Sequence, residues 1–219
     1  MSRGRYTLPH ILGYHGCDAA TGEKVLAGKT HLKPSDNDYD WLGNGIYFWV
    51  DSPQRAWDWA NYRLGPEKVC KPFVIGALIY PGLCLNLTDY GVIEQLRVAH
   101  KVLAAACGSQ EMPKNTLMQD GITLLRRRDC AVIEMLHRLR EERAEESYDS
   151  VYGVFDEGKP AFNGAGFREK THIQLAVRKT ANIVGYFRVD TSAFLKSSTM
   201  GRRTVRRSLS LKTLHEHHR

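Results

Sequence analysis

Gly43-Asn44-Gly45-Ile46-Tyr47-Phe48 is the stretch that decides the fold of this chain of 219 residues. The apolar and aromatic residues 45–50 predict a strand, in which Ile46 and Phe48 lie on one face and Tyr47 with Gly45 on the other. Tyr14-His15-Gly16 ends an earlier apolar run, residues 10–16, that predicts another strand. Each feature alone is more typical of a core, but an aromatic ring above a glycine-lined wall and a His-Gly pair together predict a ligand site.

Helix signals occur at four places. A helix over 20–27 is expected to stop at Gly28, and another begins with Ser52 as N-cap and Pro53 at its first position. Apolar residues at helical spacing predict helices over 92–106 and 125–139, the latter with an outer Glu134–Arg138 pair. Residues 108–120 between them form an irregular connector.

Strand signals lie on both sides of these helices. Residues 72–80 and 83–87 predict two strands across a turn, and further strands are expected over 149–155, 171–178 and 182–189. Strands, then helices, then strands indicate an α+β fold rather than alternating βαβ units. Because no GxGxxG and no P-loop motif occurs, neither of those phosphate-binding sites is supported.

The composition is that of a globular protein, with 42% hydrophobic and 25% charged residues. No apolar run approaches the roughly 20 residues of a membrane span, and residues 1–9 lack the apolar segment of a secretory signal. Five cysteines without a CxxC pair favour reduced thiols. We therefore expect a cytoplasmic protein, with no membrane contact and no metal.

Basic residues gather at the C-terminal end. Residues 196–219 contain seven Lys or Arg and one Glu, so this tail carries +6 of the net charge of +7. Such a tail contacts polyanions through phosphate pairing and counterion release, or is simply a solvated end. The preceding body, residues 1–195, is close to neutral and has the size of one domain.

The two opening motifs, Trp41-Leu42 between them and the Ser-Pro helix start resemble the NAD-binding core of ADP-ribosyltransferases. The similarity is to the poly(ADP-ribose) polymerase, or diphtheria-toxin-like, branch. It is specific over residues 11–62, fair over 149–189 and weak across the helical middle. The resemblance implies two packed antiparallel sheets that form a cleft for NAD, with a helical insert at about 88–147. It also implies an enzyme that cleaves NAD to nicotinamide and transfers ADP-ribose to a protein or nucleic-acid acceptor.

The resemblance assigns roles to residues of the first two strands. His15 is expected to bond a ribose hydroxyl of NAD, and Gly16 to present its backbone N–H and C=O to the nicotinamide carboxamide. Tyr47 is expected to stack on the nicotinamide ring, with Tyr14 and Gly45 also at the cofactor site. The loop 162–168 lies where the family recognises its acceptor.

The glutamate that the family places on a late strand is missing here. On the strand over 171–178, Ile173, Leu175 and Val177 are expected to meet the core, so that His172 and Gln174 face the cleft. The alternative is that these two side chains only support neighbouring strands. Because Gln lacks a negative charge, single rather than repeated ADP-ribose transfer is expected. Glu157 and Glu169 of the preceding loop could take the glutamate's place, although the spacing favours mild effects of their mutation.

Two other functions remain open. A tRNA 2′-phosphotransferase has the same fold and also consumes NAD, and Arg126-Arg127-Arg128 would supply part of a phosphate site. A module that binds NAD, ADP-ribose or nucleic acid without catalysis would explain the missing glutamate. A toxin, an antiphage effector and a regulator all fit the sequence.

Overall fold

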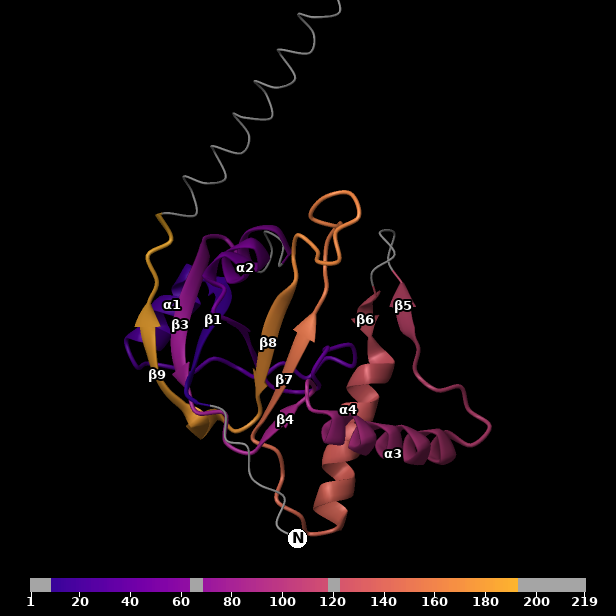
Figure 1. Cartoon of the computed structure of the whole chain (residues 1–219). Helices are drawn as coiled ribbons and strands as arrows, with labels where there is room; N and C mark the ends of the chain where they lie inside the picture. The colour runs from indigo at the N-terminus through magenta and orange to yellow at the C-terminus, as the bar shows by residue number, and fades with distance from the viewer. Residues whose placement is uncertain (1–8, 64–68, 118–122, 193–219) are drawn as a thin grey trace, which may run out of the picture.

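The structure is a computed structural model that describes residues 9–63, 69–117 and 123–192, so that the basic tail lies outside it. The elements are shown in Figure 1. In chain order they are β1 (Ile11–Asp18), α1 (Ala19–Leu26), β2 (Ile46–Val50), α2 (Pro53–Asp58), the π-helix η1 (Trp59–Arg63), β3 (Pro72–Ile79), β4 (Cys84–Asn86), α3 (Tyr90–Cys107), β5 (Asn115–Leu117), β6 (Thr123–Arg126), α4 (Arg127–Glu142), β7 (Ser150–Phe155), β8 (His172–Val177), the 3-10 helix η2 (Thr180–Asn182) and β9 (Ile183–Arg188).

The strands form one large mixed sheet and one hairpin. The large sheet has seven strands in the order β4-β7-β8-β2-β1-β3-β9, and β5 pairs with β6 in a separate hairpin. The β4–β7 pair is parallel, and the other neighbours are antiparallel. The α+β prediction is confirmed. The expected two packed antiparallel sheets are instead one continuous sheet in the described residues, because β1 and β2 remain paired at Tyr14 and Trp49.

Cross-strand pairs determine which side chains share a face of this sheet. Tyr14 lies opposite Trp49, Trp49 opposite Gln174, and Tyr47 opposite Ala176, so these residues define the first face. The second face carries Phe48, which is fully buried with Ile46 in the main core of that side. The predicted alternation of β2 is therefore confirmed.

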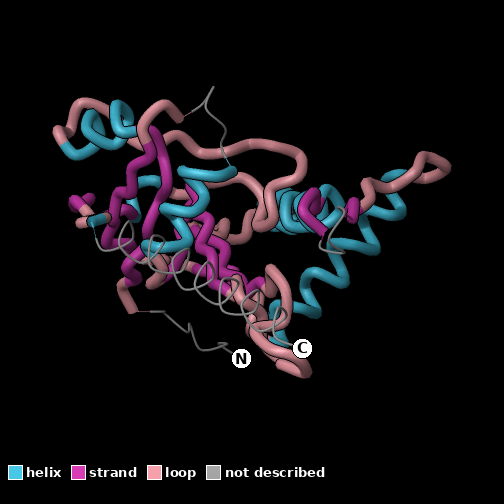
Figure 2. The backbone as a smooth tube through the Cα atoms, turned by 90° about the horizontal axis from the view of Figure 1, so that it is seen from above, coloured by secondary structure: helices cyan, strands magenta, loops and turns pink. Residues whose placement is uncertain are grey.

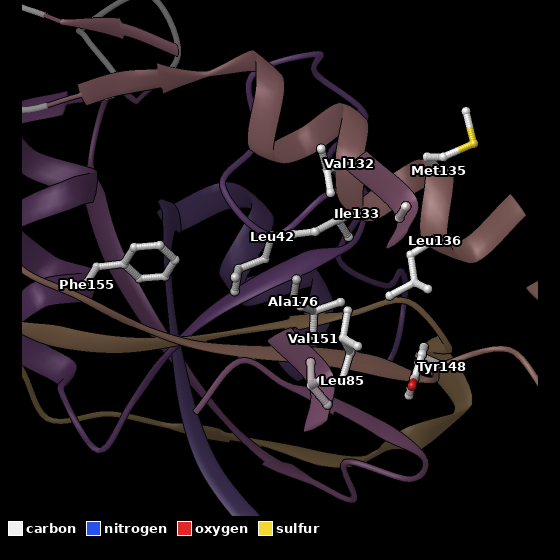
Figure 3. Packing of buried hydrophobic residues seen from close by; sticks show 12 residues of the cluster. Leu42, Leu85, Val132, Ile133, Met135, Leu136, Tyr148, Val151, Phe155 and Ala176 are labelled. Atoms are coloured by element: carbon white, nitrogen blue, oxygen red, sulfur yellow. The ribbon is translucent and has the colours of Figure 1, made fainter. Parts of the chain in front are cut away.

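The second face of the sheet buries a core that includes Ile11, Ile46, Phe48, Ile75, Ala77, Ile79, Leu175 and Val177, with Val25 of α1 and Leu32 packed on it. The first face is covered in two places. Helix α2 packs over β1 and β3 through Ala56, beside Trp49 and Val74. Helix α4 packs over β7 and β8, and Figure 3 shows Ile133 and Leu136 near Leu42, Ala176 and Val151.

The helical insert is part of the domain core rather than an appendage. Figure 2 shows α3 and α4 to one side of the large sheet, and four apolar residues of α4 are buried in the core with Leu85 and Val151. The β5–β6 hairpin within the insert was not predicted. Its Asn115 stabilises the start of α4, because the Asn115 side-chain oxygen accepts from the Arg128 N–H at 3.0 Å and the Asp129 N–H at 3.3 Å.

One local prediction is wrong, and two are confirmed with a difference in detail. Glu134 does not pair with Arg138 but binds Arg178, which follows β8, at 2.6 Å, because α4 packs against this part of the sheet. The strands expected over 72–80 and 83–87 are present as β3 and β4, but β3 pairs with β1 and β9, whereas β4 lies at an edge of the sheet beside β7. Ser52 is the N-cap residue of α2 and Pro53 its first residue, although the Ser52 side chain makes no cap hydrogen bond among the described residues.

Candidate functional site

The large sheet opens at the residues that the sequence singles out. The β1–β2 ladder ends at the Tyr14–Trp49 pair. Beyond Tyr14, β1 pairs with β3 as far as Asp18, whereas residues 46–48 of β2 pair with β8. The second half of β1 and the first half of β2 therefore separate from one another.

His15 spans this opening with its side chain. Its Nδ1 lies 2.8 Å from the backbone oxygen of Tyr47. Since a carbonyl oxygen only accepts, Nδ1 carries the proton and Nε2 presents a lone pair in the neutral ring. Burial lowers the pKa of His15, and the hydrogen bond to Tyr47 opposes this effect only in part. The ring is therefore neutral at pH 7. No partner of Nε2 lies among the described residues, so this atom is available to accept from a hydroxyl group.

The same contact changes the surroundings of Gly16. The Asp51 N–H donates to the Leu12 carbonyl, so ladder alternation directs the N–H and C=O of Gly16 toward β2 as well. In a continued ladder Gly16 would lie opposite Tyr47 and donate to its carbonyl. His15 occupies that carbonyl instead. The described ladder therefore leaves the Gly16 backbone facing the opening.

Gly16 is also required for packing. A Cβ atom at Gly16 would lie 2.2 Å from the backbone oxygen of Ala56 in α2, closer than any real contact. The sequence predicts Gly16 for a different reason, the close approach of a ligand. The packing requirement and the predicted ligand contact concern different atoms, because the missing Cβ faces α2 and the peptide groups face β2.

Tyr47 lies on the first face and is anchored by its hydroxyl. The hydroxyl donates to the Gly43 carbonyl at 2.7 Å and accepts from the Leu42 N–H at 2.8 Å. Burial raises the pKa of Tyr47, so the hydroxyl stays protonated and serves no proton transfer near neutral pH. The ring of Tyr47 and the ring of His15 lie on opposite faces of the sheet, and what joins the residues is the hydrogen bond through the opening.

Gly45 and Tyr14 are placed less favourably for ligand contact. A Cβ atom at Gly45 would lie 3.0 Å from the Val177 oxygen, and its backbone pairs with Ser35, so this glycine serves the packing of β2 on β8. Tyr14 packs beside Trp49, and its ring lies edge-on to Phe187 at 6.1 Å. Their predicted roles at the cofactor site stay predictions.

His172 is buried rather than facing an open cleft. It is 6% exposed, its Nδ1 lies 2.7 Å from the Lys170 oxygen, and its Nε2 is buried without a hydrogen-bond partner among the described residues. Burial lowers the pKa of His172. Gln174 is partly exposed between Trp49 and Gly153 on the first face. Of the predicted core residues, Leu175 and Val177 are fully buried and Ile173 is half-buried. Ala176 on the other face is fully buried as well, because α4 covers it.

A buried ion pair lies beside His172. Arg55 of α2 donates to the carboxylate of Glu157, which follows β7, and His172 Nδ1 lies 3.9 Å from the same carboxylate oxygen. The side chains of Arg55 and Glu157 are 17% and 9% exposed. Glu169, the other acidic candidate in the loop, is exposed. The structure thus brings Glu157, and not Glu169, into contact with a predicted site residue.

The role of Arg55 and the contacts of Trp41 were not predicted from the sequence. The Arg126 guanidinium lies 4.2 Å from the centre of the Trp41 ring and 5.0 Å from that of Phe155. The Phe155 ring lies 5.7 Å from the His172 ring. No spacing rule connects these residues, since they come from four separate segments. The Arg55–Glu157 pair likewise joins distant segments and is recognised only in the folded chain.

The loop between β7 and β8 carries two exposed rings. Phe162 and Phe167 are each 60% exposed and meet edge to face at 5.5 Å.

No group of three or more His, Cys, Asp or Glu side chains suited to a metal occurs in residues 9–63, 69–117 and 123–192. In the same ranges, no helix combines the length and apolar character that a bilayer span requires.

Comparison with known proteins identifies one short region of similarity. The chain is 41% identical over 63 residues to an uncharacterized protein of Methanocaldococcus jannaschii. The matched region covers 29% of this chain and 26% of that protein. The chain thus spans about a quarter of the length of that relative. No protein-family profile and no solved structure matches the chain.

Proposed function

We propose that this protein is an NAD-dependent ADP-ribosyltransferase that transfers single ADP-ribose groups, built on the fold of that superfamily. The observation that carries the proposal is the opening between β1 and β2, where His15 takes the carbonyl that Gly16 would otherwise bond. This arrangement presents a histidine acceptor and a free strand edge side by side.

The chemistry of NAD fits these groups. Nε2 of His15 is an acceptor suited to a ribose hydroxyl, since its ring is held neutral. The N–H and C=O of Gly16 match the C=O and NH₂ of the nicotinamide carboxamide, which is recognised by one donor and one acceptor. Tyr47 contributes to this site by fixing the turn at Gly43 and by holding His15 through its carbonyl.

Glu157 is the best candidate for the carboxylate that the sequence lacks on β8. In the reaction, the bond between ribose C1′ and the nicotinamide nitrogen breaks, and nicotinamide leaves with the bonding electrons. The acceptor atom then bonds to C1′ and releases its proton. A carboxylate of low exposure stabilises positive charge on the ribose and accepts that proton. Arg55 holds Glu157 in position by donating to its carboxylate, with His172 beside the pair, and Gln174 offers a further amide on the first face.

One observation favours the runner-up, a module that binds NAD without cleaving it. Glu157 is already paired with Arg55, so its charge is partly compensated before any substrate binds. The tRNA 2′-phosphotransferase alternative is less well supported, because Arg127 pairs with Asp38 at 3.0 Å and Arg128 bonds the Pro113 carbonyl at 2.9 Å. These arginines do not converge on one phosphate site.

Release of nicotinamide from NAD tests the proposal. Purified protein is incubated with NAD, and nicotinamide is measured by chromatography, with binding of NAD measured separately by calorimetry. We expect release by the wild type and at least roughly a tenfold loss with His15→Ala, since a hydrogen bond made at the reacting ribose is removed. His31→Ala, an exposed histidine outside the site, is the matched control.

Three outcomes are informative. Binding without release would support the module, and release only with a 2′-phosphorylated RNA would support the phosphotransferase. No binding and no release by the wild type would refute the assignment of NAD to this site.

A further inference from the structure

A cavity of about 450 Å³ lies between the helical insert and the large sheet, next to the candidate site. Its walls come from α3, α4, the segment before β2 and the ends of β6 and β7. Apolar side chains form much of the lining, namely Trp41, Leu87, Ile93, Leu96, Val132, Ile133 and Phe155. Its volume is in the range of small-ligand sites, large enough for one nucleotide and too small for a folded partner.

Cations surround this apolar space. Arg97 and Lys101, one helical turn apart on α3, line it together with Arg126 and Arg128, whereas Asp129 is the one carboxylate among its lining residues. The Arg97 side chain is 59% exposed and pairs with Glu94 on the solvent side of α3, and Lys101 is also exposed, so both cations reach solvent beside the cavity. Positive charge next to an apolar wall fits a ligand that has an anionic part and an apolar part.

The aromatic wall narrows the choice of ligand. The Arg126 guanidinium lies over the Trp41 ring, and the Phe155 ring lies 4.7 Å from Trp41 at an angle of 57°, so aromatic rings and a guanidinium line the same wall. Unpaired nucleobases stack on aromatic and guanidinium groups while neighbouring phosphates bind Arg and Lys. An acidic peptide without aromatic residues would satisfy the cations but has no ring to stack on this wall.

From these features we infer that the cavity is the acceptor site of the proposed transferase and binds single-stranded nucleic acid. One unpaired base enters between Trp41 and α4, and the flanking phosphates contact Arg97 and Lys101. The role of the cavity as an acceptor site rests on the proposed function, whereas the binding of nucleic acid in the cavity does not. Phe155 joins the cavity to the candidate site, because its ring lies 5.7 Å from His172 beside Glu157.

Binding without NAD tests the inference. Fluorescence anisotropy of labelled dT12 and rU12, with a duplex of the same length, is measured with the full chain at several salt concentrations. We expect both single strands to bind more tightly than the duplex. Trp41→Ala should raise the dissociation constant about tenfold through loss of stacking, and Trp41→Phe should largely restore it. The double change Arg97→Ala and Lys101→Ala should weaken binding and lower the salt slope by roughly 1.4.

Lys24→Ala is the matched control, since it removes one exposed cation of α1, which packs on β1, β3 and β9, and Lys24 is not among the residues that line the cavity. Because the basic tail also attracts nucleic acid, the contact is located by photo-cross-linking of a 5-bromodeoxyuridine or 4-thiouridine strand and mass spectrometry of the peptides. Cross-links within residues 90–101 or at Trp41 support the inference. A preference for dT12 over rU12, or the reverse, identifies the kind of strand.

Several results would overturn the inference. These are cross-links confined to residues 193–219, equal binding of duplex and single strand, or cavity variants that bind like the wild type. A further test incubates the protein with labelled NAD in a cell lysate. If only protein carries the label, and the Trp41→Ala variant gives the same labelling, the cavity does not select the acceptor. Failure of NAD cleavage with oligonucleotide binding intact would refute the proposed function and leave the cavity assignment standing.

Discussion

His15 and His172 are chemically alike and differ in access. In both, Nδ1 meets a backbone carbonyl, of Tyr47 and of Lys170, so Nε2 is the acceptor in both neutral rings. Burial lowers the pKa of both. His15 lies at an opening of the sheet and is partly exposed. Nε2 of His172 is instead buried beside the Arg55–Glu157 pair and has no partner in the part of the chain that the structure describes.

This difference teaches that the same histidine chemistry serves two purposes. His15 is partly exposed beside the gap, with its Nδ1 bonded to the Tyr47 carbonyl and its Nε2 without a partner among the described residues. His172 is 6% exposed and lies beside Glu157. We therefore propose ligand contact for His15 and a packing role beside Glu157 for His172.

The largest expected effect is on the His172 side. Glu157→Gln leaves the guanidinium of Arg55 without its carboxylate, which should lower the free energy of unfolding by about 3 kcal/mol. Nicotinamide release should fall by at least roughly 100-fold if Glu157 stabilises the ribose charge, with NAD affinity little changed. This reverses the mild effect that the sequence favoured, because the carboxylate is buried in an ion pair.

Glu169→Gln, at an exposed position of the same loop, is the control and should be silent in both assays. Calorimetric unfolding measures the change in the free energy of unfolding, and chromatography measures the rate of nicotinamide release. Normal turnover in a folded Glu157→Gln protein would remove Glu157 from the mechanism.

On the His15 side, Gly16→Ala should be the most damaging change. The added methyl group would overlap the Ala56 oxygen, so α2 and β1 must move apart at a cost of about 1–3 kcal/mol, and NAD binding should weaken with them. Gly166→Ala, where nothing lies within 4 Å, should leave stability nearly unchanged. Equal melting temperatures for the two variants would show that α2 does not pack on Gly16 as described.

Tyr47→Phe separates the anchor of Tyr47 from its ring. It removes the hydrogen bonds to Gly43 and Leu42 and leaves a partly buried N–H without its acceptor, which should cost about 1–2 kcal/mol of stability. NAD affinity should fall only slightly, since the ring and the carbonyl that holds His15 are retained. The exposed Tyr90→Phe serves as control in chemical denaturation. A selective loss of NAD affinity without loss of stability would assign the hydroxyl to the ligand instead.

The smallest effect is on the pH dependence of the two histidines. A histidine with a lowered pKa binds protons less readily in the folded state, so its contribution to stability is complete above about pH 6.5 and is lost as the pH falls below that value. His172→Gln should flatten this acid-side loss in melting temperature. His15→Gln should flatten the acid-side loss of NAD affinity, and exposed His31→Gln should change neither. Imidazole NMR signals that titrate above pH 6.5 would contradict the assignment.

Short-range patterns predicted the local structure well. The alternation of Ile46, Tyr47 and Phe48 was correct because a strand repeats every two residues, and the Gly28 stop was correct because this residue has φ of +67° after α1. The strands on both sides of Pro81-Gly82 are present as well, but β4 goes to one edge of the sheet whereas β3 lies between β1 and β9. Local signals do not say which strand becomes the neighbour.

The sequence by itself determined the α+β class, because the order of strand and helix signals along the chain indicates it. It also determined the candidacy of His15, Gly16 and Tyr47, since that depends on residue types within two short segments. Only the tertiary structure decided that His15 takes the Tyr47 carbonyl, that His172 is buried, and that Glu157 is chosen over Glu169. The Arg55–Glu157 contact joins residues 102 positions apart. Such contacts depend on the packing of helices and loops against the sheet, which residue spacing along the chain does not specify.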